Sequence, residues 1–165
     1  MKPYLMMITL SLIVLSFFGH SSGGSWKFGG KVSMEQGDNQ PDLVTAVTAE
    51  YQIVSTLSWR TDLEAIFRDM GTGSDFDISL PTNLLWFPLQ HKKTLEPYMG
   101  PGLVYTYALP NTHYFGMNVM GGITINPRNK PSFGLEVKYT VTNFTGWTAS
   151  DKFSISLTGA WEADF

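Results

Sequence analysis

The sequence predicts an all-β protein, an eight-stranded antiparallel up-and-down β-barrel that spans a membrane. Three observations support this fold. After Trp26, apolar and polar residues alternate with a period of two, which is typical of strands with two different faces. Aromatic residues make up 14% of the 165 residues and glycine occurs 16 times, a composition that favours strands and turns. The alternating segments are about 9 to 15 residues long, which suits tilted membrane-spanning strands.

The N-terminal segment differs sharply from the rest of the chain. Lys2 precedes an almost unbroken apolar run from Leu5 to Phe18, and small residues follow it. This pattern predicts a cleaved secretory signal peptide over residues 1–22, with the barrel domain over 23–165. A transmembrane anchor is the alternative, but the run is shorter than the roughly 20 apolar residues that such a helix needs. The chain has no cysteine, so we expect no disulfide and no lipid-anchored N-terminus.

The first four strands are predicted over 26–34, 43–52, 57–68 and 76–88. In the first, Trp26, Phe28 and Val32 alternate with Lys27, Gly29 and Lys31. The third places Trp59, Leu63 and Phe67 on one face and Arg60, Asp62 and Glu64 on the other. Turn residues separate the second and fourth strands from their neighbours.

The last four strands are predicted over 94–108, 113–126, 132–145 and 152–165. In the seventh, Leu135, Val137 and Tyr139 alternate with Glu136, Lys138 and Thr140. The eighth is the clearest, because Phe153, Ile155 and Leu157 alternate with serines and a threonine. An even number of strands places both ends of the domain at the same end of the barrel, together with basic turns that contain Lys92, Lys93, Arg128 and Lys130.

Alternation leaves open which face looks outward. A soluble, lipocalin-like barrel would bury the apolar face, whereas a membrane barrel shows it to lipid. Strand length and the bulky charges of both signs on the polar face favour the membrane barrel. So do aromatic residues near the predicted strand ends, as in an interfacial girdle. These are Trp26, Trp59, Trp86, Phe87, Tyr105, Tyr107, Trp147, Trp161 and Phe165.

The polar face predicts a charge network inside the lumen. Its candidate members are Arg60, Asp62, Glu64, Arg68, Glu96, Glu136 and Lys138. By parity, the complete inward set comprises six basic residues (Lys27, Lys31, Arg60, Arg68, Lys138 and Lys152) and eight acidic residues (Glu50, Asp62, Glu64, Asp77, Glu96, Glu136, Glu162 and Asp164). A selective pore usually has an excess of one sign. The near balance, and the narrow lumen of eight strands, predict a plugged barrel.

Three stretches resemble the family of small outer-membrane barrels that includes the OmpX, OmpA-barrel and OmpW types. Residues 80–87, LPTNLLWF, resemble the fourth strand of that family, and 95–105, LEPYMGPGLVY, resemble its fifth. The chain ends with Trp161, Ala163 and Phe165 at alternate positions, similar to the family's C-terminal assembly signal. Pro101 departs from the pattern, and we expect a bulge or bend there because proline removes a ladder hydrogen bond.

The resemblance implies an outer-membrane location and a monomeric barrel. It also implies contact with membrane lipid and lipopolysaccharide, and handling by periplasmic chaperones and the barrel assembly machinery. The formal net charge of −3 gives no reason to expect nucleic-acid binding.

Some members of that family modify lipid A, but the residues for this chemistry are not expected here. Thr140-Val141-Thr142-Asn143 resembles the deacylase motif, with threonine in place of the histidine base. The histidines are His20, His91 and His113, which are too few and too scattered for a zinc site. We therefore predict no catalytic, metal or cofactor site.

The leading hypothesis is a non-enzymatic barrel with a structural, envelope or surface role. One alternative is transport of a small apolar molecule through a lateral opening near Pro101, as the OmpW-like resemblance implies. Another is a soluble periplasmic barrel that binds a ligand in an apolar interior. The lipid A-modifying enzyme is the weakest alternative, because the base that would activate its nucleophile is missing.

Overall fold

The computed structural model describes residues 25–36, 41–68, 76–89, 94–108, 112–126, 131–142 and 150–163. Eight strands run through these ranges: β1 (Trp26–Glu35), β2 (Asp42–Val54), β3 (Leu57–Phe67), β4 (Phe76–Trp86), β5 (Leu95–Ala108), β6 (Thr112–Ile125), β7 (Ser132–Thr142) and β8 (Ser150–Ala163). The predicted signal peptide lies outside the described residues, so it stays a prediction. Among the described residues, no helix is long and apolar enough to cross a membrane.

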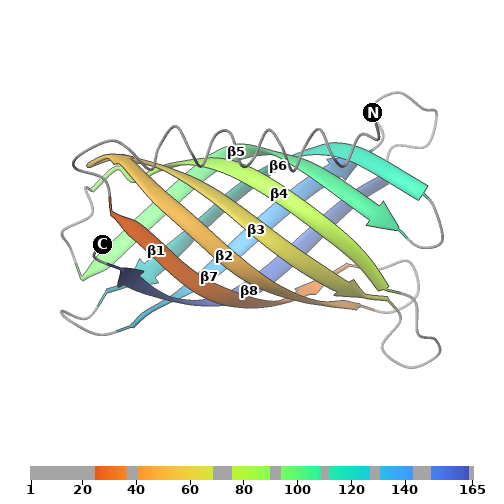
Figure 1. Cartoon of the computed structure of the whole chain (residues 1–165), viewed down its shortest axis with the longest axis horizontal. Coiled ribbons are helices and arrows are strands. Elements are labelled where there is room, and N and C mark those ends of the chain that lie inside the picture. Colours follow the sequence, from red (N-terminus) through yellow and green to blue (C-terminus); the bar gives the residue numbers. More distant parts are fainter. Residues whose placement is uncertain are drawn as a thin grey trace.

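The strands form one closed antiparallel barrel, in which each strand pairs with its neighbour in sequence (Figure 1). β8 closes the barrel against β1, from the pair Trp26–Ala163 to the pair Glu35–Ser154. Closure leaves no open sheet edge with unsatisfied backbone groups. We call the end at Trp26 and Ala163 the terminal end and the end at Glu35 the distal end. The prediction that both ends of the domain lie at the same end of the barrel is confirmed, while the predicted basic turns lie outside the described residues.

The two faces of the wall have opposite characters, as the alternation predicts. Apolar side chains point outward, and Leu157, Val47 and Phe133 are 69%, 66% and 61% exposed. Charged side chains point inward, and Asp62 and Glu136 are 0% exposed. The barrel therefore has a polar interior and an apolar exterior, which is the reverse of a soluble barrel. The apolar interior that the soluble alternative requires is not what the structure shows.

The observed strands lie close to the predicted ranges, and the differences fall at strand ends. β4 ends at Trp86 rather than at residue 88, and β2 continues to Val54 rather than ending at residue 52. Ends are the least specified parts of a strand, because alternation fades where the chain enters a turn.

Two prolines interrupt the pairing on both sides of β4. The β3–β4 ladder lacks the positions opposite Asp62 and Leu63, where Pro81 stands. The β4–β5 ladder lacks the positions opposite Leu84 and Leu85, where Pro101 stands. Proline has no backbone N–H to donate, so each residue weakens the ladder on the side that its nitrogen faces.

The bulge expected at Pro101 is wrong. The pairs Asn83–Gly102 and Trp86–Met99 on either side of the gap keep one register, and β5 pairs with β6 without a break from Leu95 to Ala108. Gly100, next to Pro101, admits the β4 backbone at this point. A Cβ atom at Gly100 would lie only 1.9 Å from the carbonyl oxygen of Leu84. β4 and β5 therefore accommodate Pro101 by approaching each other closely at Gly100, without an extra residue inserted in β5.

Most predicted girdle aromatics lie on the outer face near a strand end. Trp86 and Trp161 are exposed near the terminal end, and Trp26 packs against Tyr51 with ring centroids 5.0 Å apart. Trp59 pairs with Tyr51 on the next strand, while Tyr105 and Tyr107 lie in the distal part of β5. The prediction that Phe87 belongs to the girdle is wrong. Its side chain is 4% exposed and packs against Tyr98, which parity places in the lumen. Trp147 and Phe165 lie outside the described residues.

Candidate functional site: the luminal charge network

Six charged side chains from three strands meet in the middle of the lumen. We call them the luminal charge network: Lys31 from β1, Arg60, Asp62 and Glu64 from β3, and Glu136 and Lys138 from β7. Each is at most 5% exposed. Their positions follow from strand parity, because every second residue of a strand points to the same face.

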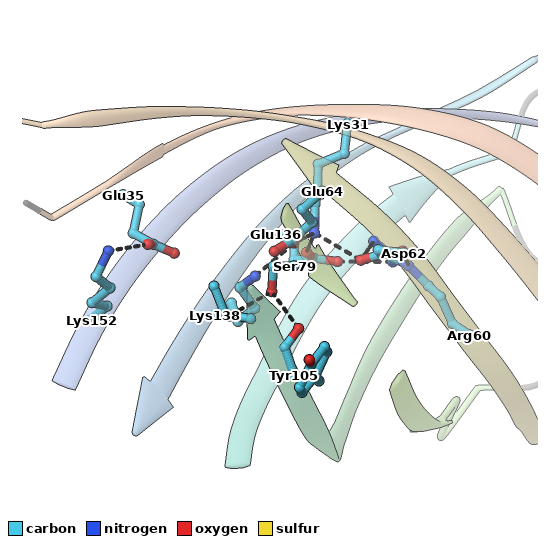
Figure 2. Close-up of polar contacts among 11 residues, drawn as sticks. Lys31, Glu35, Arg60, Asp62, Glu64, Ser79, Tyr105, Glu136, Lys138 and Lys152 are labelled. Carbon is cyan, nitrogen blue, oxygen red and sulfur yellow. Dashed lines mark hydrogen bonds and ion pairs between the residues drawn. The ribbon is translucent and has the colours of Figure 1, made fainter. Parts of the chain in front are cut away.

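Lys31 is the centre of the network (Figure 2). Its Nζ atom lies 2.8 Å from Oδ2 of Asp62, 2.7 Å from Oε1 of Glu64 and 3.5 Å from Oε1 of Glu136. The Nζ atom of Lys138 lies 2.7 Å from the same Glu64 oxygen. One ammonium group therefore joins carboxylates from β3 and β7, which lie on opposite sides of β1 in the wall.

Arg60 joins the same two strands by a second route. Its Nε donates to Oδ1 of Asp62 at 3.0 Å, and its Nη1 lies 2.9 Å from Oε2 of Glu136. Tyr98 of β5 donates its hydroxyl to the same Glu136 oxygen at 2.8 Å. The phenol reaches Glu136 across Gly122, where a Cβ atom would lie 2.7 Å from Cζ and Oη of Tyr98.

The network is electrically neutral, with three cations and three carboxylates among its six members. Burying an unpaired charge costs several kcal/mol, so close pairing is what makes such a cluster tolerable in a lumen. The arrangement crosses the barrel and braces its walls. It presents no excess of either sign to a passing ion.

The seven predicted network residues do not all lie together. Arg60, Asp62, Glu64, Glu136 and Lys138 meet as expected, whereas Arg68 and Glu96 lie toward opposite ends of the barrel. Arg68 forms an ion pair with Asp77 at the distal end. Glu96 accepts a hydrogen bond from Asn126 and has the ammonium of Lys27 at 4.0 Å, near the terminal end.

A separate ion-pair cluster lies at the distal end. The Nζ atom of Lys152 lies 2.8 Å from Oε1 of Glu35 and 3.2 Å from Oδ2 of Asp42, so it joins β8 to β1 and β2. Figure 2 shows Lys152 and Glu35 set apart from the luminal charge network. Of the other residues expected to face inward, Glu162 is exposed near the end of β8, and Asp164 lies outside the described residues.

Sequence reasoning placed Lys31 in the lumen but left it out of the candidate network, and it missed Tyr98. Alternation gives the face of each residue but not its height in the barrel, so it could not show that Lys31 is the hub. For Tyr98 a signal did exist. It shares parity with Glu96 on β5, and a buried phenol needs a hydrogen-bond partner.

The terminal end holds a small polar cavity of about 40 Å³. Its lining includes Lys27, Glu50, Glu96, Tyr98 and Thr124. A buried water molecule needs about 10–15 Å³, so the cavity has room for a few waters. It is too small for a drug-sized or lipid-like ligand, whose pockets are about 300–1,000 Å³.

The described residues offer no group of histidine, cysteine or carboxylate side chains that could hold a metal ion. Thr140, which stands in place of a catalytic histidine, is 6% exposed and points into the lumen. His113 is engaged elsewhere, since its Nδ1 lies 2.6 Å from the hydroxyl of Tyr105.

The residues of the predicted assembly signal are only partly described. Trp161 is 58% exposed on the outer face of β8, and Ala163 ends that strand opposite Trp26. Phe165 lies outside the described residues. The role of these three residues in assembly stays a prediction.

Comparison with known proteins gives a likeness of fold alone. No family model and no curated protein matches the chain. Among solved structures, the barrel is similar to Neisserial surface protein A, with a TM-score of 0.60 and 14% identity over 87% of this chain and 98% of that one. It is also similar to the N-terminal β-barrel domain of OprF from Pseudomonas aeruginosa, with a TM-score of 0.58 and 9% identity over 84% of this chain and 99% of that one.

A third similar structure is the outer-membrane enzyme PagL, with a TM-score of 0.52 and 12% identity over 81% of this chain and 97% of that one. The chain thus has the fold of small eight-stranded outer-membrane barrels, at low sequence identity to each. Since an enzyme shares this fold, the fold by itself does not decide between a catalytic and a non-catalytic role.

Proposed function

We propose that this chain is an integral outer-membrane protein that supports the envelope as a non-enzymatic, plugged barrel. The observation that carries the proposal is the reversal of the two faces. The exterior carries exposed apolar side chains on all eight strands, and the lumen holds a neutral network of paired charges.

The exterior supports a lipid environment. Large apolar side chains such as Leu103, Val119 and Ile155 are at least half exposed on several strands. A soluble monomer rarely exposes apolar patches of more than a few hundred Å², because exposed apolar area costs about 25 cal/mol per Å² in water. An apolar band bounded by aromatic girdles is what a bilayer stabilises.

The lumen supports a structural role rather than conduction. The luminal charge network crosses the centre of the barrel with ion pairs of 2.7 to 3.5 Å, and its members are almost fully buried. An ion would have to displace these pairs in order to pass. Conduction requires sites that bind weakly enough to release the ion, and a neutral cluster of short ion pairs is not such a site.

Fractionation of cells that express the full chain tests the membrane assignment. We expect the protein in the detergent-extracted outer membrane, with a gel band that shifts on boiling because the closed barrel resists unfolding in detergent. A soluble periplasmic protein without a heat shift would refute the proposal.

Planar-bilayer recording tests the plug. The purified barrel should show no steady conductance, and the double variant Glu64→Gln/Lys138→Met, which removes one carboxylate together with its cation, should show more open events. A steady open channel in the unchanged protein would exclude the plugged lumen.

A second candidate is passage of a small apolar molecule through the wall, and one observation favours it. The interrupted β4–β5 ladder lies beside a buried apolar cluster inside the lumen, made of Leu85, Phe87, Tyr98 and Met120. This candidate can be tested by locking the seam with Leu84→Cys/Pro101→Cys, since the chain has no other cysteine. Lateral passage predicts that the oxidised variant takes up an apolar fluorescent probe more slowly than Thr82→Cys/Leu103→Cys. Equal rates would exclude it.

A further inference from the structure

Charges of alternating sign lie side by side on three neighbouring strands near the terminal end. Glu50 of β2 pairs in the ladder with Lys27 of β1 on one side and with Arg60 of β3 on the other. All three residues line the small polar cavity at this end, which has a volume of about 40 Å³. Opposite charges directly across a ladder are close enough to attract each other. A direct ion pair between Glu50 and one of the two cations is therefore the simplest expectation.

Both cations are engaged with other carboxylates instead. The ammonium of Lys27 lies 4.0 Å from Glu96 of β5, and Arg60 pairs with two carboxylates of the luminal charge network at 3.0 and 2.9 Å. In the part of the chain that the structure describes, neither cation forms an ion pair with Glu50. The side chain of Glu50 is half-buried, and a carboxylate that is partly removed from solvent needs hydrogen-bond donors.

We propose that resident water molecules in this cavity join Glu50 to Lys27 and Arg60. At about 10–15 Å³ for each buried water, the cavity holds about three. A buried water is held by two to four polar partners, and the lining supplies the hydroxyl groups of Thr124 and Thr158 besides the charged groups. Water donates to a carboxylate and accepts from an ammonium or a guanidinium group, so it serves both signs at once.

The charges of the lining favour water over an ion. They comprise two cations, Lys27 and Arg60, and two carboxylates, Glu50 and Glu96. A bound cation would meet the first two at close range and a bound anion would meet the last two, so neither sign gains a net attraction. Water carries no charge, and a water-mediated hydrogen bond is nearly as favourable in enthalpy as a direct one.

The cavity also touches the luminal charge network. Arg60 belongs to both, because it pairs with Glu136 and lines the cavity. The waters therefore continue the network toward the terminal end and connect it to β2, a strand that supplies none of its six members. This link depends on the fold and not on where the protein resides, so failure of the fractionation test would leave it standing.

A crystal structure of the folded protein in detergent, at a resolution that shows ordered water, tests the proposal. We expect about three waters in the cavity, one of them within hydrogen-bond distance of the Glu50 carboxylate and of Lys27 or Arg60. A direct ion pair between Glu50 and either cation would overturn the proposal, and so would a cavity without ordered water.

Two neighbouring variants on β8 sharpen the result. Ala160 lines the cavity, so Ala160→Val adds two methyl groups there. We expect it to displace the waters at Glu50 and to lower the midpoint of urea denaturation. Gly159→Ala is the matched control. Gly159 borders the cavity through its backbone, but its added Cβ would lie on the outer face near Phe133 and meet no atom closer than 3.9 Å.

The control should keep both the waters and the midpoint of the unchanged protein. Loss of the waters in Gly159→Ala, or their persistence in Ala160→Val, would count against a site in this cavity. Should Ala160→Val fail to fold, the structure of the unchanged protein still decides.

Discussion

β1 and β4 are strands of similar length in the same closed wall, yet they are held in different ways. β1 pairs with both neighbours without a gap, and its Lys31 anchors the luminal charge network. β4 has a gap in the ladder on each side, and its lumen face carries Pro81, Asn83 and Leu85. The comparison teaches that the strand with two complete ladders supplies the central cation of the network. The strand with two interrupted ladders presents a proline, an amide and an apolar side chain to the lumen around its gaps.

The largest loss in the free energy of unfolding should come from replacing Lys31 of β1, the centre of the luminal charge network. Lys31→Met keeps the length of the side chain but leaves three buried carboxylates with two cations. Breaking a buried ion pair by removing one partner costs about 3–5 kcal/mol. We expect this loss in the free energy of unfolding, measured by urea denaturation of the barrel in lipid vesicles.

Lys27→Met is the matched control for Lys31→Met. Lys27 lies four residues away on the same face of β1, and its ammonium is 4.0 Å from the carboxylate of Glu96. A contact at this limit of ion-pair distance should contribute less than the three short contacts of Lys31, so we expect a smaller loss. Equal losses in the two variants would show that the luminal charge network does not brace the barrel.

The second effect tests the path by which β5 reaches the network. Gly122→Ala places a Cβ atom 2.7 Å from Cζ and Oη of Tyr98 and from the backbone oxygen of Leu135. Overpacking of this kind costs about 1–3 kcal/mol, and it should push the phenol away from Glu136. Urea denaturation would report the first change, and the nuclear magnetic resonance signals of the Tyr98 ring would report the second.

Gly121→Ala serves as the control on the opposite face of β6, where a Cβ atom has at least 3.5 Å of room. It should leave the free energy of unfolding unchanged. A loss as large in Gly121→Ala as in Gly122→Ala would mean that any side chain on this strand is harmful, whatever the position of Tyr98.

A smaller change, here an increase in the free energy of unfolding, is expected from a variant in the β4–β5 ladder. Pro101→Val supplies the backbone N–H that the β4–β5 ladder lacks, and one hydrogen bond contributes about 0.5–1.5 kcal/mol. Pro97→Val is the control, because Pro97 lies beyond Met99, the last β5 residue paired with β4. Hydrogen exchange should show a protected amide at residue 101 and an unprotected one at 97. An unprotected amide at residue 101 would mean that the proline does not cause the gap.

The smallest effect belongs to the ion pair at the distal end. Arg68 has a side chain that is 42% exposed, so its pair with Asp77 is screened by solvent. In a double-mutant cycle of Arg68→Ala and Asp77→Asn, we expect a coupling energy of at most about 1 kcal/mol. It should fall at 1 M salt, where the Debye length is about 3 Å. A coupling energy that salt leaves unchanged would mean that this ion pair is shielded from solvent, like the ion pairs of the luminal charge network.

The sequence predicted the fold well because the period of two is strict along most strands. In β8, Ile155 and Leu157 point outward while Ser154 and Ser156 are buried, as alternation requires. The same rule correctly gave the inward direction of Arg60, Asp62 and Glu136. It could not give the stagger between strands, which decides which charges lie at the same height.

For that reason Arg68 and Glu96 were grouped with residues that they do not contact, and Lys31 was left out of the group. Phe87 was misjudged for a related cause. It follows the last residue of β4, where aromatic side chains were expected to face lipid, but parity with Leu85 turns it inward. Pro101 was expected to force a bulge, because the space that Gly100 provides becomes visible only when the two strands are placed side by side.

The central position of Lys31 also has a consequence for how the barrel forms. Its partners on β3 lie about thirty residues away in sequence, but Glu136 comes from β7, and Lys138 reaches Glu64 across a separation of 74 residues. Contacts of such high sequence separation are slow to form, because the entropy of loop closure must be paid first. Until β7 arrives, Glu64 lacks one of its two cations and Arg60 lacks its second carboxylate. The network is therefore neutralised only once β7 is in place, so we expect pairing of its charges to come late, close to closure of the barrel.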